Sequence, residues 1–176
     1  MLKKQIAILL IFSLIITICV IYSSLKISKE YYNTHSFFYD PVMSYSQTIP
    51  FYKRMQQEAH LNQFVSRVNF AILHFKADPK APFSLIPTIF FFPQLLASPW
   101  AMIPSVSLML FVFLFILGYS LYIRKHSILY CFSIMIFFCA APVLYNPERG
   151  IVAGWLDLPA SLLLVSGIIS FLNWNT

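Results

Sequence analysis

The stretch from Ala81 to Ile123 contains no aspartate, glutamate, lysine or arginine. A second uncharged run, Ile6–Leu25, follows Lys3 and Lys4 near the N-terminus. About 20 consecutive apolar residues are enough for a helix to cross a bilayer. The whole chain of 176 residues is 59% hydrophobic and only 10% charged, whereas soluble domains carry about 25% charged residues. The sequence therefore predicts an integral membrane protein and excludes an ordinary soluble domain.

The apolar runs predict an all-α fold, a multi-pass membrane helix bundle that forms a single membrane domain. We expect about four transmembrane helices, at residues 6–25, 105–123, 127–145 and 157–174. The first run also has the basic start of a signal peptide, but no small-residue cleavage site follows it. We therefore favour an uncleaved first span over a cleaved signal peptide.

The polar segment 26–80 and the proline-rich segment 83–98 connect the first two spans. Apolar residues of the polar segment recur at spacings of three and four, which indicates one face of a helix. They are Leu61, Phe64, Val65, Val68, Ile72 and Phe75, preceded by a shorter stripe at Phe51, Met55 and Ala59. We interpret them as two amphipathic helices on the membrane surface. A small soluble helical hairpin that covers the bundle is the alternative. We expect segment 83–98 to be interfacial or partly inserted.

Two tight basic clusters predict the orientation of the chain. Lys3 and Lys4 precede the first span, and Arg124 and Lys125 follow the second span, two crossings later. Basic residues next to span ends favour the cytoplasmic side. The basic residues of loop 26–80 argue the other way, but the loop is near the length at which the rule weakens. We therefore expect a cytoplasmic N-terminus and all six acidic residues outside.

Three outer features contain candidate functional residues, and each has a purely structural alternative. Asp40 precedes a proline and fits a turn. Lys80 leads into an apolar segment and fits a lysine that extends its charge to the membrane surface. Asp157, in "NPERGIVAGWLDLP", fits a helix N-cap with Pro159 in the first turn. The sequence shows no glycine-rich phosphate loop and no nucleophile elbow.

The residues that usually bind metals show no ligand pattern. His35, His60 and His74 are scattered without a metal-ligand spacing. The three cysteines, at positions 19, 131 and 139, lie inside apolar runs and indicate neither a zinc site nor a disulfide framework. We expect no cofactor, while a need for a divalent metal stays open. The formal charge of +6 favours lipid headgroups and anionic ligands over nucleic acid in a membrane chain.

The order of these features resembles the N-terminal part of the GT-C glycosyltransferases, especially the aminoarabinose and protein mannosyltransferases that use polyprenyl-phosphate sugars. An early acidic residue of the first outer loop matches Asp40. A Lys-Pro or His-Pro motif matches "DPKAPFSLIP", with Ala81 inserted between Lys80 and Pro82. An "LDP"-like motif at the fourth span matches "LDLP", also with one extra residue. Many members have a second acid beside the first, where this chain has Pro41.

The resemblance implies transfer of a sugar from a polyprenyl-phosphate donor to a lipid or glycan acceptor, on the outer face of a bacterial inner membrane. Asp40 would be the catalytic base. Lys80 and Arg149 would bind the donor phosphate, and Asp157 would lie at the cavity rim. Family members continue for many more spans, so we expect a truncated protein, or a subunit completed by a second chain, that is inactive alone. The alternative is a small non-enzymatic four-span membrane protein; a transporter is less favoured.

Overall fold

The computed structural model describes residues 2–34, 49–50, 52–57, 66, 69, 82–97, 100, 103–147 and 157–174. All regular structure in these residues is helical. The α-helices are α1 (Leu2–Tyr32), α4 (Pro82–Phe91), α5 (Ile103–Ile123), α6 (Ile128–Cys139) and α7 (Asp157–Trp174). Two short 3-10 helices, η2 (Pro93–Ala97) and η3 (Pro142–Tyr145), follow α4 and α6. The prediction of an all-α protein is confirmed for this part of the chain.

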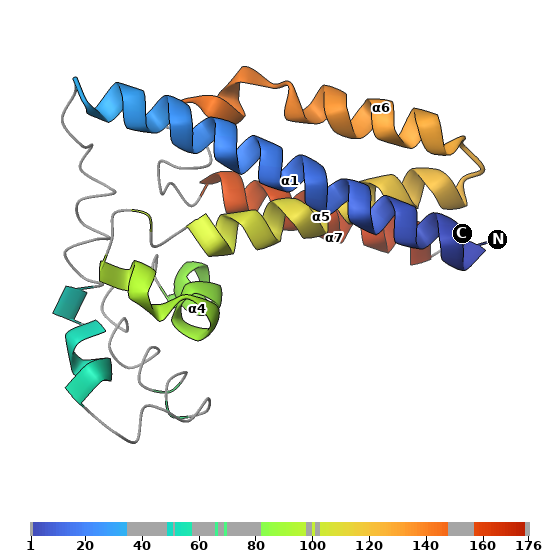
Figure 1. Ribbon diagram of the computed structural model, residues 1–176. Coiled ribbons are helices and arrows are strands. Elements are labelled where there is room, and N and C mark those ends of the chain that lie inside the picture. Colours follow the sequence, from blue (N-terminus) through green and yellow to red (C-terminus); the bar gives the residue numbers. More distant parts are fainter. Residues whose placement is uncertain are drawn as a thin grey trace.

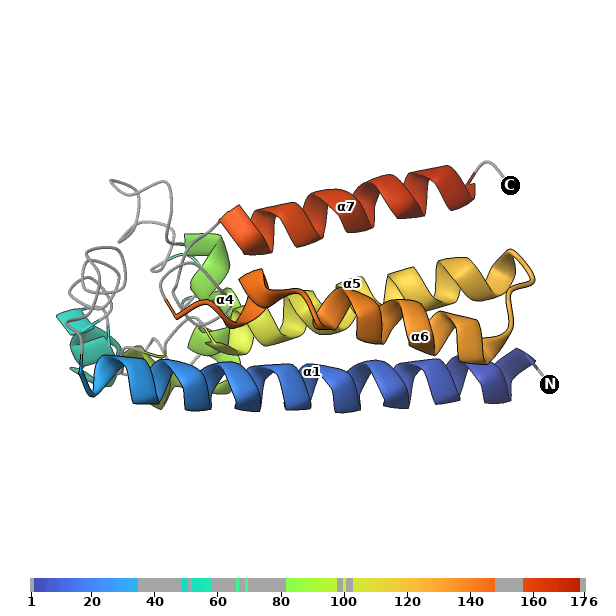
Figure 2. The same ribbon diagram turned by 90° about the horizontal axis from the view of Figure 1, so that it is seen from above.

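Helices α1, α5, α6 and α7 run lengthwise beside one another, and α5 lies between the other three (Figures 1 and 2). Helix α7 packs mainly against α5, whereas α1 and α6 also contact each other. Short helix α4 lies at the end of the bundle where α1 finishes and α5 begins (Figure 1). Both chain termini lie at the opposite end, which we call the terminal end (Figures 1 and 2). The end that holds α4 is called the loop end.

Among the described residues, two helices are long and apolar enough to cross a membrane, Lys3–Tyr32 and Ile103–Ile123. The segments Ile128–Cys139 and Ser161–Asn173 are shorter apolar helices. A 12-residue helix such as α6 rises only about 18 Å, against a hydrocarbon core of roughly 30 Å. The described part of the chain thus has two candidate membrane helices, and the number of four spans stays a prediction.

The expected span 127–145 is not one continuous helix. Helix α6 stops at Cys139, and the chain continues as η3 only from Pro142. Proline disfavours a helical conformation in the residue before it, and Ala141 is extended, with φ −63° and ψ 122°. Pro142 also has no N–H to donate to the preceding turn. The proline therefore breaks the helix inside the expected span 127–145, for which a single helix is predicted.

Helix α1 also differs from its expected bounds, because it continues past Leu25 to Tyr32. The first residues of the predicted loop 26–80 are therefore helical, while the bounds of the span stay a prediction. Lys26 and Lys29 project into solvent from the last turns of α1, while Ser28 between them is buried. Both ends of α1 therefore carry exposed lysines, so α1 alone does not decide the orientation.

The core of the bundle lies where α1, α5 and α6 meet. Buried apolar side chains from these helices pack together, among them Val20, Leu110, Leu114 and Met135. The rings of Phe12 on α1 and Phe132 on α6 stack with centroids 3.8 Å apart. Gly118 of α5 has no side chain, and this leaves room for the side chains of Met135 and Leu9. A Cβ atom there would lie 2.9 Å from Met135 Sδ and 3.3 Å from Leu9 Cδ2.

The first predicted amphipathic stripe is described only in part. Residues 52–57 are helical, and Met55 among them is buried. Phe51, Ala59 and the apolar positions of the second stripe lie outside the described residues. That these helices rest on a membrane surface stays a prediction.

The turn between α5 and α6 holds a lysine in a left-handed conformation. Lys125 has φ 64°, and its N–H donates to Tyr122 O at 3.0 Å while the N–H of His126 donates to Leu121 O at 3.3 Å. These two hydrogen bonds cap the C-terminus of α5. The left-handed position in such a cap is usually occupied by glycine. A side chain in this conformation costs about 1–2 kcal/mol, so the turn carries local strain.

We expect Lys125→Gly to raise the free energy of unfolding by about 0.5–1 kcal/mol, because glycine relieves the strain but adds entropy to the unfolded chain. Thermal unfolding of the purified protein in detergent measures the change. Arg124→Gly is the control, since the backbone of Arg124 does not have a positive φ, and it should not stabilise. A lower melting temperature for Lys125→Gly would show that the lysine side chain contributes more than its strain costs.

Candidate functional site

The candidate residues belong to segments that join helices at the loop end of the bundle. Asp40 follows the end of α1, Lys80 precedes α4, and Arg149 follows η3. These three residues lie outside the described part of the chain. Asp157 is the first residue of α7, and the structure does not describe its side chain. The four side chains are thus outside the described part of the structure, and their roles stay predictions.

The helix ends that lead to these segments are described, and they meet. The hydroxyl of Tyr32, the last residue of α1, donates a hydrogen bond to Pro147 O at 2.7 Å. The Tyr32 ring also lies 6.4 Å, centroid to centroid, from the ring of Trp100 just before α5. The end of α1, the start of α5 and the chain that leads to Arg149 are thus held at one place. The sequence did not reveal this contact, since Tyr32 and Pro147 are 115 positions apart.

A second contact joins α1 to the same connection. The hydroxyl of Ser24 is buried and donates to Leu144 O of η3 at 3.4 Å. Tyr145 of η3 donates its hydroxyl to Cys139 O at 2.8 Å, across the break after α6. The Tyr145 bond satisfies a carbonyl at the C-terminus of α6 that has no partner within the helix, and the Ser24 bond satisfies a carbonyl of η3. The path of the chain from α6 towards Arg149 is therefore fixed by hydrogen bonds as far as Pro147.

Among the described residues, two buried hydroxyl groups near the loop end have no hydrogen-bond partner. Ser28 lies in the last turns of α1 and Ser105 in the first turn of α5, and both are fully buried. Ser13 satisfies its hydroxyl by donating to the carbonyl oxygen of Leu9 at 2.8 Å. Ser105 lacks this option because the residue four positions earlier precedes α5. A buried unpaired polar group costs about 1–3 kcal/mol, so these serines offer hydrogen bonds to a ligand or water at this end.

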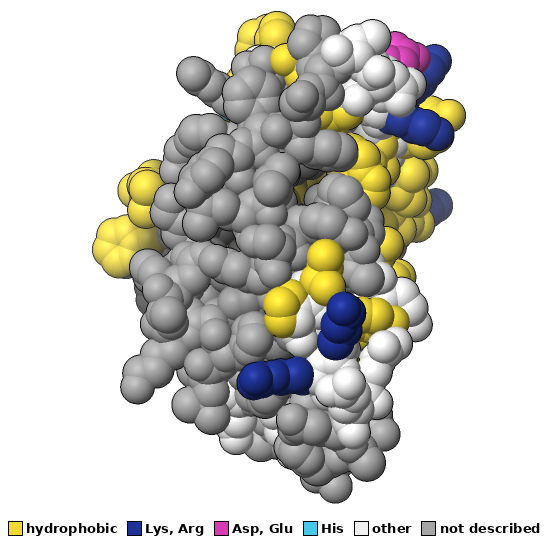
Figure 3. Space-filling model, turned by 90° about the vertical axis from the view of Figure 1, so that its left-hand side faces the viewer, with side chains coloured by type: hydrophobic (Ala, Val, Ile, Leu, Met, Phe, Trp, Pro, Cys, Tyr) yellow, Lys and Arg dark blue, Asp and Glu magenta, His cyan; other side chains and the backbone are white. Residues whose placement is uncertain are grey.

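The described charged side chains on the surface of the loop end are of both signs. Figure 3 looks onto this end and shows basic side chains in its lower middle and basic and acidic side chains at its upper right edge. Lys26, Lys29, Lys53 and Arg54 are exposed, and Glu30 is the acidic residue whose side chain is described. Within the described residues no group of three His, Cys, Asp or Glu side chains is placed to hold a metal ion.

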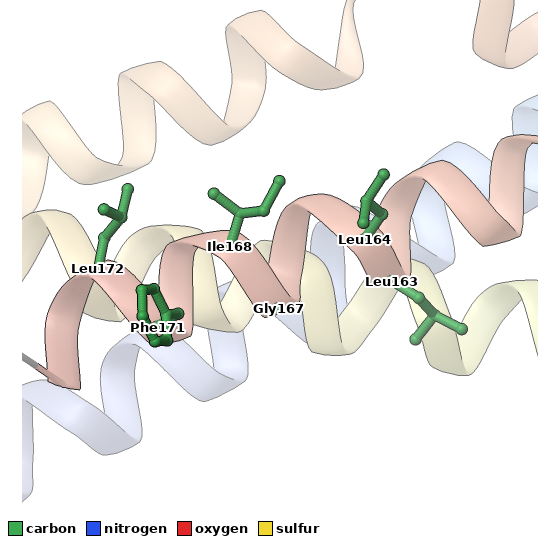
Figure 4. A pocket seen from close by; sticks show the side chains of 6 residues that line it. All are labelled: Leu163, Leu164, Gly167, Ile168, Phe171 and Leu172. Carbon is green, nitrogen blue, oxygen red and sulfur yellow. The ribbon is translucent and has the colours of Figure 1, made fainter.

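A shallow apolar depression lies on α7, away from the loop end. Its lining comes from one helix: Leu163, Leu164, Gly167, Ile168, Phe171 and Leu172 (Figure 4). It forms because Gly167 has no side chain, and nothing lies within 4 Å of the place where a Cβ would stand. No ionisable group lines it, so it offers apolar contact and no acid-base chemistry.

Comparisons with protein-family models, with curated proteins and with solved structures give no match for this chain. The class of protein that the observations define is an all-helical protein with two helices suited to a membrane. Anything more specific about the function is a proposal.

Proposed function

We propose that this chain is the N-terminal portion of a membrane glycosyltransferase of the GT-C type. It would transfer a sugar from a polyprenyl-phosphate donor to a lipid or glycan acceptor on the outer face of a bacterial inner membrane. In this proposal α1, α5, the segment formed by α6 and η3, and α7 cross the membrane, with the N-terminus in the cytoplasm. The loop end then faces outward.

One observation carries the proposal. The segments with Asp40, Lys80 and Arg149 are attached to helix ends at the loop end, and α7 begins there with Asp157. Residues from four separate parts of the sequence therefore have a common region within reach. The bond from Tyr32 to Pro147 ties two of these parts together directly. This supports a single outer site built from all four segments.

The chemistry of such a transfer assigns a role to each residue. The acceptor hydroxyl must lose a proton as its oxygen attacks the anomeric carbon, and the Asp40 carboxylate would accept that proton. The bond from the anomeric carbon to the phosphate oxygen then breaks, and negative charge gathers on the leaving phosphate. Lys80 and Arg149 would stabilise that charge. Asp157, at the start of α7, would border the site.

A second candidate, a non-enzymatic membrane subunit completed by another chain, is favoured by one observation. The exposed face of α7 is apolar and includes Leu164 and Phe171. Gly167 on this helix leaves room for the close approach of another helix. Small residues allow membrane helices to pack closely. The same face is equally suited to lipid, so we place this candidate second.

The test is sugar transfer by membranes of the native organism with and without the gene. Membranes are incubated with radiolabelled polyprenyl-phosphate sugars, and labelled lipid and glycan products are separated. We expect loss of one product in the deletion strain and its return when the gene is restored. Unchanged transfer from every donor tested would contradict the enzymatic proposal and favour the subunit.

A further inference from the structure

The terminal end of the bundle carries a cluster of basic residues that the proposed function does not use. Lys3, Lys4, Arg124 and Lys125 are all exposed. Together with His126 they belong to the N-terminus of α1 and the α5–α6 turn. Among the described residues no acidic side chain lies at this end, and the sequence ranges 1–29, 103–147 and 158–176 contain no aspartate or glutamate.

The charges come together because α1 and α5 run in opposite directions. Leu9 and Gly118 lie side by side where the two helices cross. Lys4 is five residues before Leu9 and Arg124 is six residues after Gly118, which places both about 8–9 Å beyond the crossing at 1.5 Å per residue. The two pairs of cations are therefore at the same level, and Figures 1 and 2 show the start of α1 beside the α5–α6 turn.

The local structure holds the basic turn in place. Lys125 occupies the left-handed position despite its strain, and the His126 ring stacks on Tyr130 with centroids 4.8 Å apart. Backbone strain of this kind is found more often at functional sites than elsewhere. The turn thus presents Arg124 and Lys125 at the end of α5 in a defined arrangement.

The sides of the bundle next to this cluster are apolar. Ile11 on α1 is 54% exposed and Leu129 on α6 is 71% exposed, just inward of the charges. A surface of cations bordered by exposed apolar side chains matches a lipid, whose phosphate lies above its acyl chains. A nucleic acid or an acidic peptide would match the charges but not the apolar border.

We propose that the terminal end, formed by Lys3, Lys4, Arg124 and Lys125, binds the phosphate headgroups of anionic phospholipids. The uneven distribution of basic and acidic residues supports an anionic lipid as the ligand of this end. This end holds four of the twelve lysines and arginines without an acid, while the rest of the chain holds the other eight together with all six acids. The proposal depends neither on the transferase activity nor on which side of the membrane this end faces.

The test is lipid retention by the purified full chain in a non-ionic detergent, measured by native mass spectrometry. Phosphatidylglycerol and phosphatidylcholine with identical acyl chains are added separately. We expect wild-type protein to retain phosphatidylglycerol at least about tenfold better, and high salt to reduce this preference. Equal retention of the two lipids would overturn the proposal, as would tighter binding of duplex DNA than of phosphatidylglycerol.

A variant without the four charges locates the site. It combines Lys3→Gln, Lys4→Gln, Arg124→Gln and Lys125→Gln, and circular dichroism verifies its helix content. We expect phosphatidylglycerol retention to fall about tenfold, with phosphatidylcholine retention unchanged. Should the fourfold variant fail to fold, Lys3→Gln with Lys4→Gln gives a smaller loss in the same direction.

A matched control removes the same charge from the loop end. It combines Lys26→Gln, Lys29→Gln, Lys53→Gln and Arg54→Gln, all of which are exposed. We expect it to retain phosphatidylglycerol as the wild type does. An equal loss in both variants would show that only net charge matters and would overturn a site at the terminal end.

Discussion

Replacing Asp40 with asparagine is expected to abolish sugar transfer while the protein still inserts into the membrane. The amide keeps the shape of the side chain but cannot accept the proton of the acceptor hydroxyl. Loss of a general base lowers rates by about 10²–10⁴-fold. The exchange is made at the chromosomal gene, and transfer from the polyprenyl-phosphate donor is measured in membranes with equal amounts of the protein.

Asp157→Asn is the control for this experiment. Asp157 begins α7, and asparagine is as good a residue at a helix start as aspartate. We therefore expect only a mild loss, with helix stability changed by about 1 kcal/mol or less. Near-normal transfer by Asp40→Asn would refute its role as base. An equally complete loss in Asp157→Asn would show that Asp157 acts in the chemistry and is more than a border residue.

Replacing Gly118 with leucine is expected to lower the free energy of unfolding by about 1–3 kcal/mol or more, the usual cost of overfilling a close-packed core. The new Cβ alone would stand 2.9 Å from Met135 Sδ. Met135 and Leu9 are both fully buried, so either side chain can move only by repacking the core around it. The helices α1, α5 and α6 would have to separate where they cross. Thermal unfolding in detergent measures the loss.

Gly167→Leu on α7 is the matched control. Nothing lies within 4 Å of its Cβ position, and leucine is a better helix former than glycine by about 0.5–1 kcal/mol. We expect this variant to be as stable as wild type or more stable. A similar loss for both glycines would contradict the packing described at the helix crossing. Stabilisation by Gly118→Leu would contradict it as well.

The helical fold class could be predicted from the sequence, because long uncharged runs are compatible with few kinds of secondary structure. A membrane interior requires every backbone group to be bonded within its own segment, which favours helices. The run that ends at Ile123 coincides with the end of α5, since Arg124 and the turn at Lys125 follow at once. Where an apolar run ends directly before a turn, the end of the helix is easy to predict.

The boundaries of α1 and α6 were harder, for two different reasons. Lys26 marks the end of the apolar run but not of α1, because lysine is a good helix former and the exposed face tolerates charge. In α6 the apolar run continues through Pro142, although the helix does not. Hydropathy reports the environment of a segment, whereas the helix end depends on backbone chemistry.

The contacts at the loop end had no signal in the sequence. Tyr32 and Pro147 come together only because α1 and α6 are neighbours. Ser28 and Ser105 are single serines in apolar helices, and nothing in their spacing indicates that both are buried and unpaired. Asp40, Lys80 and Arg149 were chosen from local motifs, and their positions lie outside the described residues. These assignments stay predictions.

The central claim is that the helices cross a membrane with the loop end outside, so that Asp40, Lys80, Arg149 and Asp157 face the outer side. The lysines at both ends of α1 make a direct measurement necessary. Fusions to a reporter that is active only outside the cytoplasm are made after Lys80 and after Lys125. We expect activity after Lys80 and none after Lys125. An inactive fusion after Lys80 together with an active one after Lys125 would show that the bundle has the opposite orientation. That result would contradict an outward-facing transferase.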